Sequence, residues 1–81
     1  MYTAKVAPAD LKRRVHQLNE WLELDGLAER LYYAPVEGGH TVGWHYADTH
    51  SEATLLWAGS AKECLAAAEI VYRRWYMTAG I

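Results

Sequence analysis

Residues 60–80, SAKECLAAAEIVYRRWYMTAG, decide the fold because they carry the features of a helix with two defined ends. Ser60 and Glu63 match a capping box, in which each side chain accepts a hydrogen bond from the other residue's backbone N–H. Gly80 lies where a left-handed C-terminal cap is expected. Apolar residues recur between these ends every three or four positions, which predicts a helix over about 61–79 with one buried stripe. The residues of this stripe are Ala61, Leu65, Ala68, Tyr72, Trp75 and Ala79.

The same helix has a second apolar flank. Ala66, Ala67, Ile70 and Met77 lie away from the first stripe, and Arg74 lies among them. Packing on a sheet buries one stripe of a helix, so this flank is more apolar than a single sheet contact requires. Apolar residues interrupted by arginine are typical of protein interfaces. The alternative is that the first helix of the chain or a second copy of the protein covers the flank.

A first helix is predicted over about 10–25. Asp10 is the expected N-cap, and Gly26 is expected to end the helix. Leu27 is then positioned to pack back on Leu22, as in a Schellman ending. The apolar stripe of this helix consists of Leu11, Val15, Leu18 and Leu22, widened by Trp21 and Leu24.

Three strands are predicted between the helices. Residues 30–34 are β-prone, and Pro35 restricts them to a sheet edge or a strand end. Residues 37–39, Glu-Gly-Gly, are typical of a hairpin turn. Residues 41–46 alternate between two faces, and residues 53–58 form a third strand that is apolar on both faces.

The order α-β-β-β-α predicts an α+β fold in a single domain. Short turns join consecutive strands, which favours a three-stranded antiparallel meander with both helices packed on one face. The other face of the sheet is then open. The residues expected on this open face are Tyr32, Thr41, Gly43, His45, Thr54 and Leu56.

Composition excludes several classes of protein. A hydrophobic fraction of 52% and a charged fraction of 22% indicate a folded domain rather than a disordered tail. The formal net charge of −2 provides no global attraction to nucleic acid or anionic membrane. A single cysteine, no signal-peptide pattern and no membrane-spanning run together predict a cytoplasmic protein. Four Trp and six Tyr without any Phe indicate either a biased genome or an interface.

No residue pattern predicts catalysis or a metal site. His40, His45 and His50 lie among Asp48 and Glu52, but a spacing of five puts the first two on opposite faces of a strand. We therefore expect no metal, no cofactor and no small-molecule substrate.

The single thiol and the arginine pair of the last helix have structural interpretations. Cys64 lies in the first turn without a histidine placed as a base, so we expect it to be a buried small apolar residue. Arg73 follows Glu69 by four residues, which favours an exposed ion pair.

Residues 59–62, Gly-Ser-Ala-Lys, followed by three alanines at 66–68, resemble the start of the last helix in double-stranded-RNA-binding domains. The α-β-β-β-α order is similar over the whole chain. The resemblance implies phosphate contacts from lysines at this helix start. Only Lys62 matches, and Glu63 stands where another basic residue is expected. The chain is also similar in style to small accessory proteins of bacteriophages and mobile elements, including anti-CRISPR proteins, which implies inhibition of a host defence complex by docking.

These observations predict a non-enzymatic protein that docks on another protein or on a second copy of itself. The expected contact residues are Ile70, Arg74, Tyr76 and Met77, with Tyr32, His45 and Leu56 on the open sheet face as a second choice. The alternative is a nucleic-acid-binding module. Its expected contacts are Lys12, Arg13 and Lys62.

Overall fold

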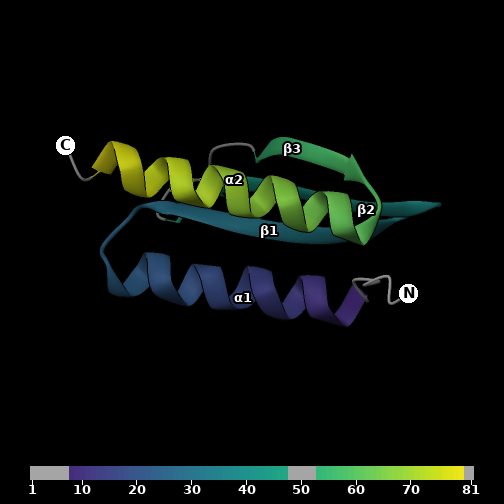
Figure 1. Cartoon of the computed structure of the whole chain (residues 1–81), viewed down its shortest axis with the longest axis horizontal. Coiled ribbons are helices and arrows are strands. Elements are labelled where there is room, and N and C mark those ends of the chain that lie inside the picture. Colours follow the sequence, from purple (N-terminus) through teal and green to yellow (C-terminus); the bar gives the residue numbers. More distant parts are fainter. Residues whose placement is uncertain (1–7, 48–52, 80–81) are drawn as a thin grey trace, which may run out of the picture.

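The computed structural model describes residues 8–47 and 53–79 and confirms the α+β fold (Figure 1). Three antiparallel strands pair in the order β1-β2-β3, and both helices pack against the sheet. The two helices start at one end of the molecule and finish at the other, as Figure 1 shows. Neither described helix is long and apolar enough to cross a membrane. The elements are α1 (Pro8–Leu24), β1 (Glu29–Val36), β2 (Gly39–Tyr46), β3 (Thr54–Gly59) and α2 (Ala61–Ala79).

Helix α1 begins earlier than the sequence predicts and ends as expected. It starts at Pro8, so Asp10 lies inside the first turn and is not the N-cap. Proline is favoured at the first helical position because its missing N–H has no partner there. At the other end, Gly26 has a φ of 75°, and the Leu27 N–H donates to the Leu22 carbonyl at 2.9 Å. This 6→1 bond confirms the Schellman ending.

The first hairpin sets the register of the sheet. Val36 pairs with Gly39 across a two-residue turn in which Gly38 has a φ of 80°, and the same register pairs Glu29 with Tyr46 at the far end. Strand β1 continues through Pro35, further than predicted. The extension is tolerated because β1 is an edge strand, where a missing N–H breaks no ladder.

The outer edge of β1 is closed by a side chain of α1. The Asn19 amide donates to the Leu31 carbonyl at 2.8 Å, and the Leu31 N–H donates to the Asn19 side-chain oxygen at 2.7 Å. Asn19 therefore pairs with the edge as a strand residue would. No described segment pairs with the outer edge of β3.

A β-bulge changes the faces of β3. Gly43 pairs with Leu55 and Val42 with Trp57, so Leu56 is the extra residue of the bulge. The prediction that Leu56 lies on the open face is therefore wrong: its side chain packs against the core below α2. Leu55 lies on the open face instead and is exposed.

Helix α2 has the predicted start. Ser60 N donates to Glu63 Oε1 and Glu63 N donates to Ser60 Oγ, both at 3.1 Å. The hydrogen bonds from Ser60 lower the pKa of the Glu63 carboxyl. The predicted cap at Gly80 lies outside the described residues.

The core lies between the helices and the inner face of the sheet. It is small and aliphatic, and the aromatic rings of Tyr33, Trp44, Tyr72 and Trp75 pack at its margin. Burying this aliphatic surface is the main favourable contribution to the fold. The buried residues are Leu11, Val15, Leu18, Leu22, Leu31, Val42, Ala61, Cys64 and Ala68.

Candidate functional site

The second apolar flank of α2 is exposed in the structure. Helix α1 packs on the other side of α2 and does not cover it. Ile70 is 62% exposed and Met77 is 76% exposed, and Trp57 of the neighbouring strand β3 is 48% exposed. We call this surface the outer flank; its members are Trp57, Ala66, Ala67, Ile70, Arg74 and Met77.

The outer flank is hollowed rather than flat. Three shallow depressions adjoin one another along it, and Ile70 lines all three. The depression nearest the start of α2 is also lined by Trp57 and the capping residue Glu63, and the one nearest its end is lined by Met77. A partner side chain could therefore fit on either side of Ile70, which is typical of the centre of an interface.

Two arginines border the outer flank without an ion pair. The predicted pair between Arg73 and Glu69 is wrong, because Glu69 accepts from Arg14 of α1 at 2.7 and 2.9 Å. The interhelical pair is favoured because Arg14 reaches the carboxylate with two N–H groups at once. Among the described residues, neither Arg73 nor Arg74 has a carboxylate partner.

Tyr76, which the sequence predicts as a contact residue beside Ile70 and Met77, does not belong to the outer flank. Its hydroxyl donates to Asp25 Oδ2 at the end of α1 and lies 3.1 Å from the Trp21 carbonyl oxygen, a second acceptor for the same hydrogen. The side chain therefore points toward α1, and its ring packs on that of Tyr72, one turn earlier on α2. Burial, together with the hydrogen bond to Asp25, raises the pKa of Tyr76.

The open sheet face carries two of the three contact residues that the sequence predicts there. The Tyr32 ring lies over Gly43, where an added Cβ would overlap it. His45 lies on the same face and contacts the Tyr46 carbonyl through Nδ1 at 3.0 Å. The structure therefore keeps Tyr32 and His45 on one face, as predicted, and separates Leu56 from them.

The residues considered for chemistry are not brought together. In the described part of the chain, no three His, Cys, Asp or Glu side chains are placed to hold a metal ion. His40 Nδ1 contacts the Tyr33 hydroxyl at 3.1 Å, and the predictions for Asp48, His50 and Glu52 fall outside the described residues. Cys64 is buried as predicted, and burial raises the pKa of its thiol.

The basic residues of the nucleic-acid alternative lie at one end of the molecule, near the starts of α1 and α2 (Figure 1). Lys12, Arg13 and Lys62 are exposed there. Acidic groups accompany them, since Arg13 pairs with Asp10 at 3.5 Å and Glu63 follows Lys62 directly. Among the described residues, this end therefore carries no concentrated positive charge of the kind that phosphate binding needs.

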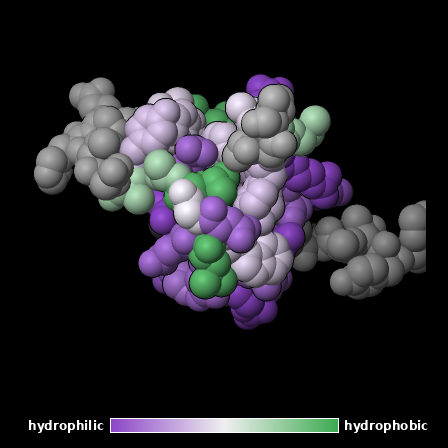
Figure 2. Space-filling view, turned by 90° about the vertical axis from the view of Figure 1, so that its left-hand side faces the viewer, coloured by the Kyte–Doolittle hydropathy of each residue, from purple (hydrophilic) through white to green (hydrophobic). Residues whose placement is uncertain are grey.

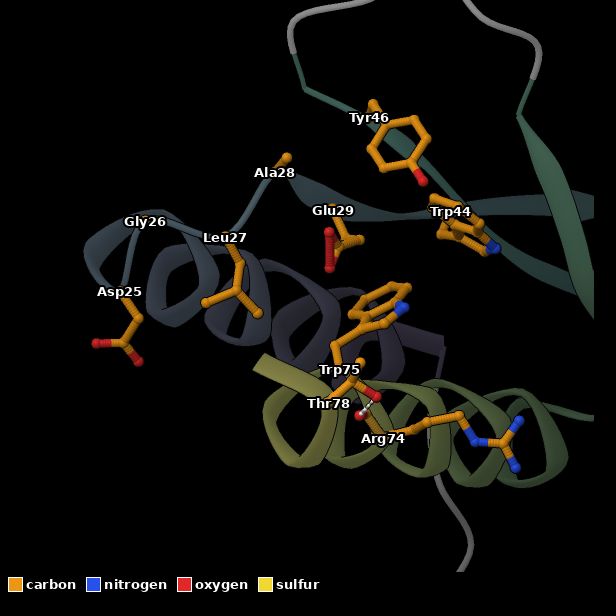
Figure 3. Close-up of a pocket in the computed structure, with 10 residues that line it drawn as sticks. All are labelled: Asp25, Gly26, Leu27, Ala28, Glu29, Trp44, Tyr46, Arg74, Trp75 and Thr78. Atoms are coloured by element: carbon orange, nitrogen blue, oxygen red, sulfur yellow. Dashed lines mark hydrogen bonds between the residues drawn. The ribbon is translucent and has the colours of Figure 1, made fainter. Parts of the chain in front are cut away.

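Another hollow, separate from those of the outer flank, lies at the end of the molecule where both helices finish. It has a volume of about 600 Å³ and is lined by the end of α1, the start of β1, the end of β2 and the last turns of α2 (Figure 3). We call it the aromatic groove, defined by Glu29, Trp44, Tyr46 and Trp75. Figure 2 looks onto this end and shows small green apolar areas separated by white and purple residues.

The rings of the aromatic groove are arranged edge to face. The Trp44 centroid lies 5.0 Å from that of Tyr46, with an interplanar angle of 88°, and 5.6 Å from that of Trp75, with an angle of 68°. Glu29 is the cross-strand partner of Tyr46, and its carboxylate points toward the Trp75 ring in Figure 3. This carboxylate has no hydrogen-bond or ion-pair partner among the described residues.

Sequence reasoning did not single out the aromatic groove or Trp57. The strong use of Trp and Tyr pointed to an interface, but not to these positions. The register of the hairpin would have placed Glu29 opposite Tyr46, had a two-residue turn been assumed. The approach of Trp75 depends on how α2 lies on the sheet, for which the sequence has no local signal.

Comparison with protein-family models, with curated proteins and with solved structures finds no match to this chain.

Proposed function

We propose that this chain is a non-enzymatic domain that docks on another protein through the outer flank. The observation that supports the proposal most directly is the exposure of Ile70 and Met77 beside Trp57, on hollows that share Ile70. Large apolar side chains that gather on one surface are unfavourable in water and favour association. Tryptophan and arginine, which adjoin Ile70 here, are the residue types enriched at interface hot spots.

The charges around the outer flank indicate the chemistry of the partner. Arg73 and Arg74 are exposed and lack acidic partners in the described part of the chain. A partner surface with an apolar centre and carboxylates at its rim would bury Ile70 and pair both guanidinium groups. We therefore propose an acidic-rimmed apolar surface of a different protein as the partner.

The experiment is an affinity capture from native lysate with the tagged wild-type domain and two variants. In the first, Ile70→Asp and Arg74→Glu together place negative charge in the middle of the outer flank. The matched control is Leu24→Asp, because Leu24 is 81% exposed and lies at the end of α1, away from the outer flank. We expect one stoichiometric protein, retained at high salt and after nuclease treatment, to be lost with the first variant and kept with the control.

Other outcomes contradict the proposal. Loss of the captured protein with both variants, or with neither, would show that the outer flank is not the contact surface. A dimer of the isolated domain that the flank variant dissociates would show that the occupant is a second copy. Capture of nucleic acid that washes off with salt would favour the nucleic-acid alternative, for which the mixed charge near Lys62 provides no support.

Identification of the captured protein tests the narrower hypothesis. The resemblance to small phage accessory proteins implies that the partner belongs to a host defence complex. A reconstituted complex should then lose activity on addition of the wild-type domain, and should keep it with the Ile70→Asp and Arg74→Glu variant.

A further inference from the structure

The fold already holds one guanidinium group between an aromatic ring and a carboxylate. Arg14 lies with its guanidinium carbon 5.2 Å from the Trp21 ring centroid, and its Nε and one terminal nitrogen donate to Glu69 Oε1 at 2.9 and 2.7 Å. Such a site joins a cation–π contact to a charge-assisted hydrogen bond. It shows which groups of this chain suit an arginine side chain.

The aromatic groove contains the same groups without the arginine. Trp44, Tyr46 and Trp75 provide three ring surfaces, and Glu29 provides a carboxylate directed at one of them. The ring faces carry negative partial charge and the carboxylate is an anion, so both would attract a cation placed between them. Arg74 borders the groove, but its side chain runs away from Glu29 in Figure 3.

We infer that the aromatic groove binds the guanidinium group of an arginine side chain from a partner protein, with Glu29 as its counter-ion and the rings of Trp44, Tyr46 and Trp75 around it. Arginine fits better than lysine because its planar group can stack on a ring and donate two N–H groups to a carboxylate together. The source is a protein rather than a free metabolite, since the groove is open along one side and small-molecule pockets enclose most of their ligand. Only the assignment of the arginine to a partner protein rests on the proposed docking function.

The binding test needs no partner protein. N-acetyl-arginine amide is titrated into the isolated domain, and the four tryptophan indole N–H signals are followed by NMR, assigned by single substitutions. We expect the Trp44 and Trp75 signals to shift with a saturable dependence on the order of millimolar. The Trp57 signal, which reports an exposed ring on the outer flank, measures unspecific stacking of the probe.

Three comparisons then decide the inference. N-acetyl-citrulline amide has nearly the same shape without the charge, and we expect it to bind roughly tenfold more weakly or worse. Glu29→Gln should weaken binding of the arginine probe by a similar factor while the thermal midpoint stays close to that of the wild type. The tripeptide acetyl-Gly-Arg-Gly-amide should bind at least as tightly as guanidinium chloride.

Several results would overturn the inference. Equal binding of the citrulline and arginine probes, or an unchanged affinity in Glu29→Gln, would show that the groove does not recognise charge. Stronger binding of guanidinium ion than of the tripeptide would exclude a side chain as the source. A tenfold gain in affinity for the arginine probe in the Arg74→Gln variant would show that Arg74 itself occupies the groove in solution. The arginine titration uses the isolated wild-type domain, and Ile70 does not line the groove, so a failure of the outer flank to dock would leave this test unaffected.

Discussion

Replacing Asn19 by leucine should destabilise the protein through the edge of β1. Asn19 and leucine are close in size, so the substitution removes the amide while keeping most of the packing volume. It breaks two hydrogen bonds, to the N–H and the carbonyl of Leu31. A hydrogen bond of this kind contributes about 0.5–1.5 kcal/mol net, so we expect a loss of about 1–3 kcal/mol in the free energy of unfolding.

The loss of stability can be measured for the whole domain and at the Leu31 amide. Urea denaturation followed by circular dichroism gives the free energy of unfolding, and a loss of about 2 kcal/mol corresponds to a fall of roughly 8–16 °C in the thermal midpoint for a domain of this size. Hydrogen exchange gives the local effect. The Leu31 amide should lose protection beyond the global change, since its acceptor is the Asn19 side chain and not another strand.

Lys12→Leu is the matched control for Asn19→Leu. Lys12 is an exposed residue of the same helix, and lysine and leucine have similar helix propensities, so this control reports the effect of an added leucine on α1. We expect it to leave stability within about 0.5 kcal/mol of the wild type. If Asn19→Leu behaves like the control and Leu31 stays protected, the Asn19 amide does not stabilise the sheet edge.

Three further predictions test the interior and the helix contact. Gly43→Ala should lower the free energy of unfolding by about 1–3 kcal/mol, because the added Cβ meets the Tyr32 ring and the Thr54 carbonyl. An unchanged urea midpoint would contradict this packing. Cys64 should react with a thiol reagent only after unfolding, because it is buried and burial raises its pKa; fast labelling of the native protein would contradict its burial. Burial and the bond to Asp25 raise the pKa of Tyr76, so the folded state keeps this proton longer than the unfolded state, and stability should fall as pH rises above about 10. Tyr76→Phe should reduce this alkaline loss in thermal melts, and an unchanged slope would exclude Tyr76 as its source.

The sequence predicts those parts of the fold that depend on neighbouring residues. The capping box of Ser60 and Glu63 and the Schellman ending at Gly26 each involve fewer than seven residues, and both are present. The five elements and their antiparallel order follow from alternation, helical period and short turns. The helical period places Ile70 away from the buried stripe, but whether another element covers it depends on how the helices pack, and the structure shows it exposed.

The errors concern contacts between distant segments. Whether Glu69 pairs with Arg73 or with Arg14 depends on the distance between the two helices, which no local pattern specifies. Tyr76 points toward α1 because Asp25 and the Trp21 carbonyl accept its hydrogen bond there. The bulge that turns Leu56 inward adds one residue to β3, and the apolar sequence of this strand is compatible with either register.

The unequal edges of the sheet limit the size of any assembly built by strand pairing. Asn19 occupies the outer edge of β1, whereas no described segment occupies that of β3. Of the two edges, that of β3 is therefore the more open to an added strand. Two copies that pair through β3 satisfy each other and stop, while a filament needs two free edges per copy. Removing the Asn19 amide would leave the N–H and carbonyl of Leu31 unpaired on the second edge, which is one requirement for pairing at both edges.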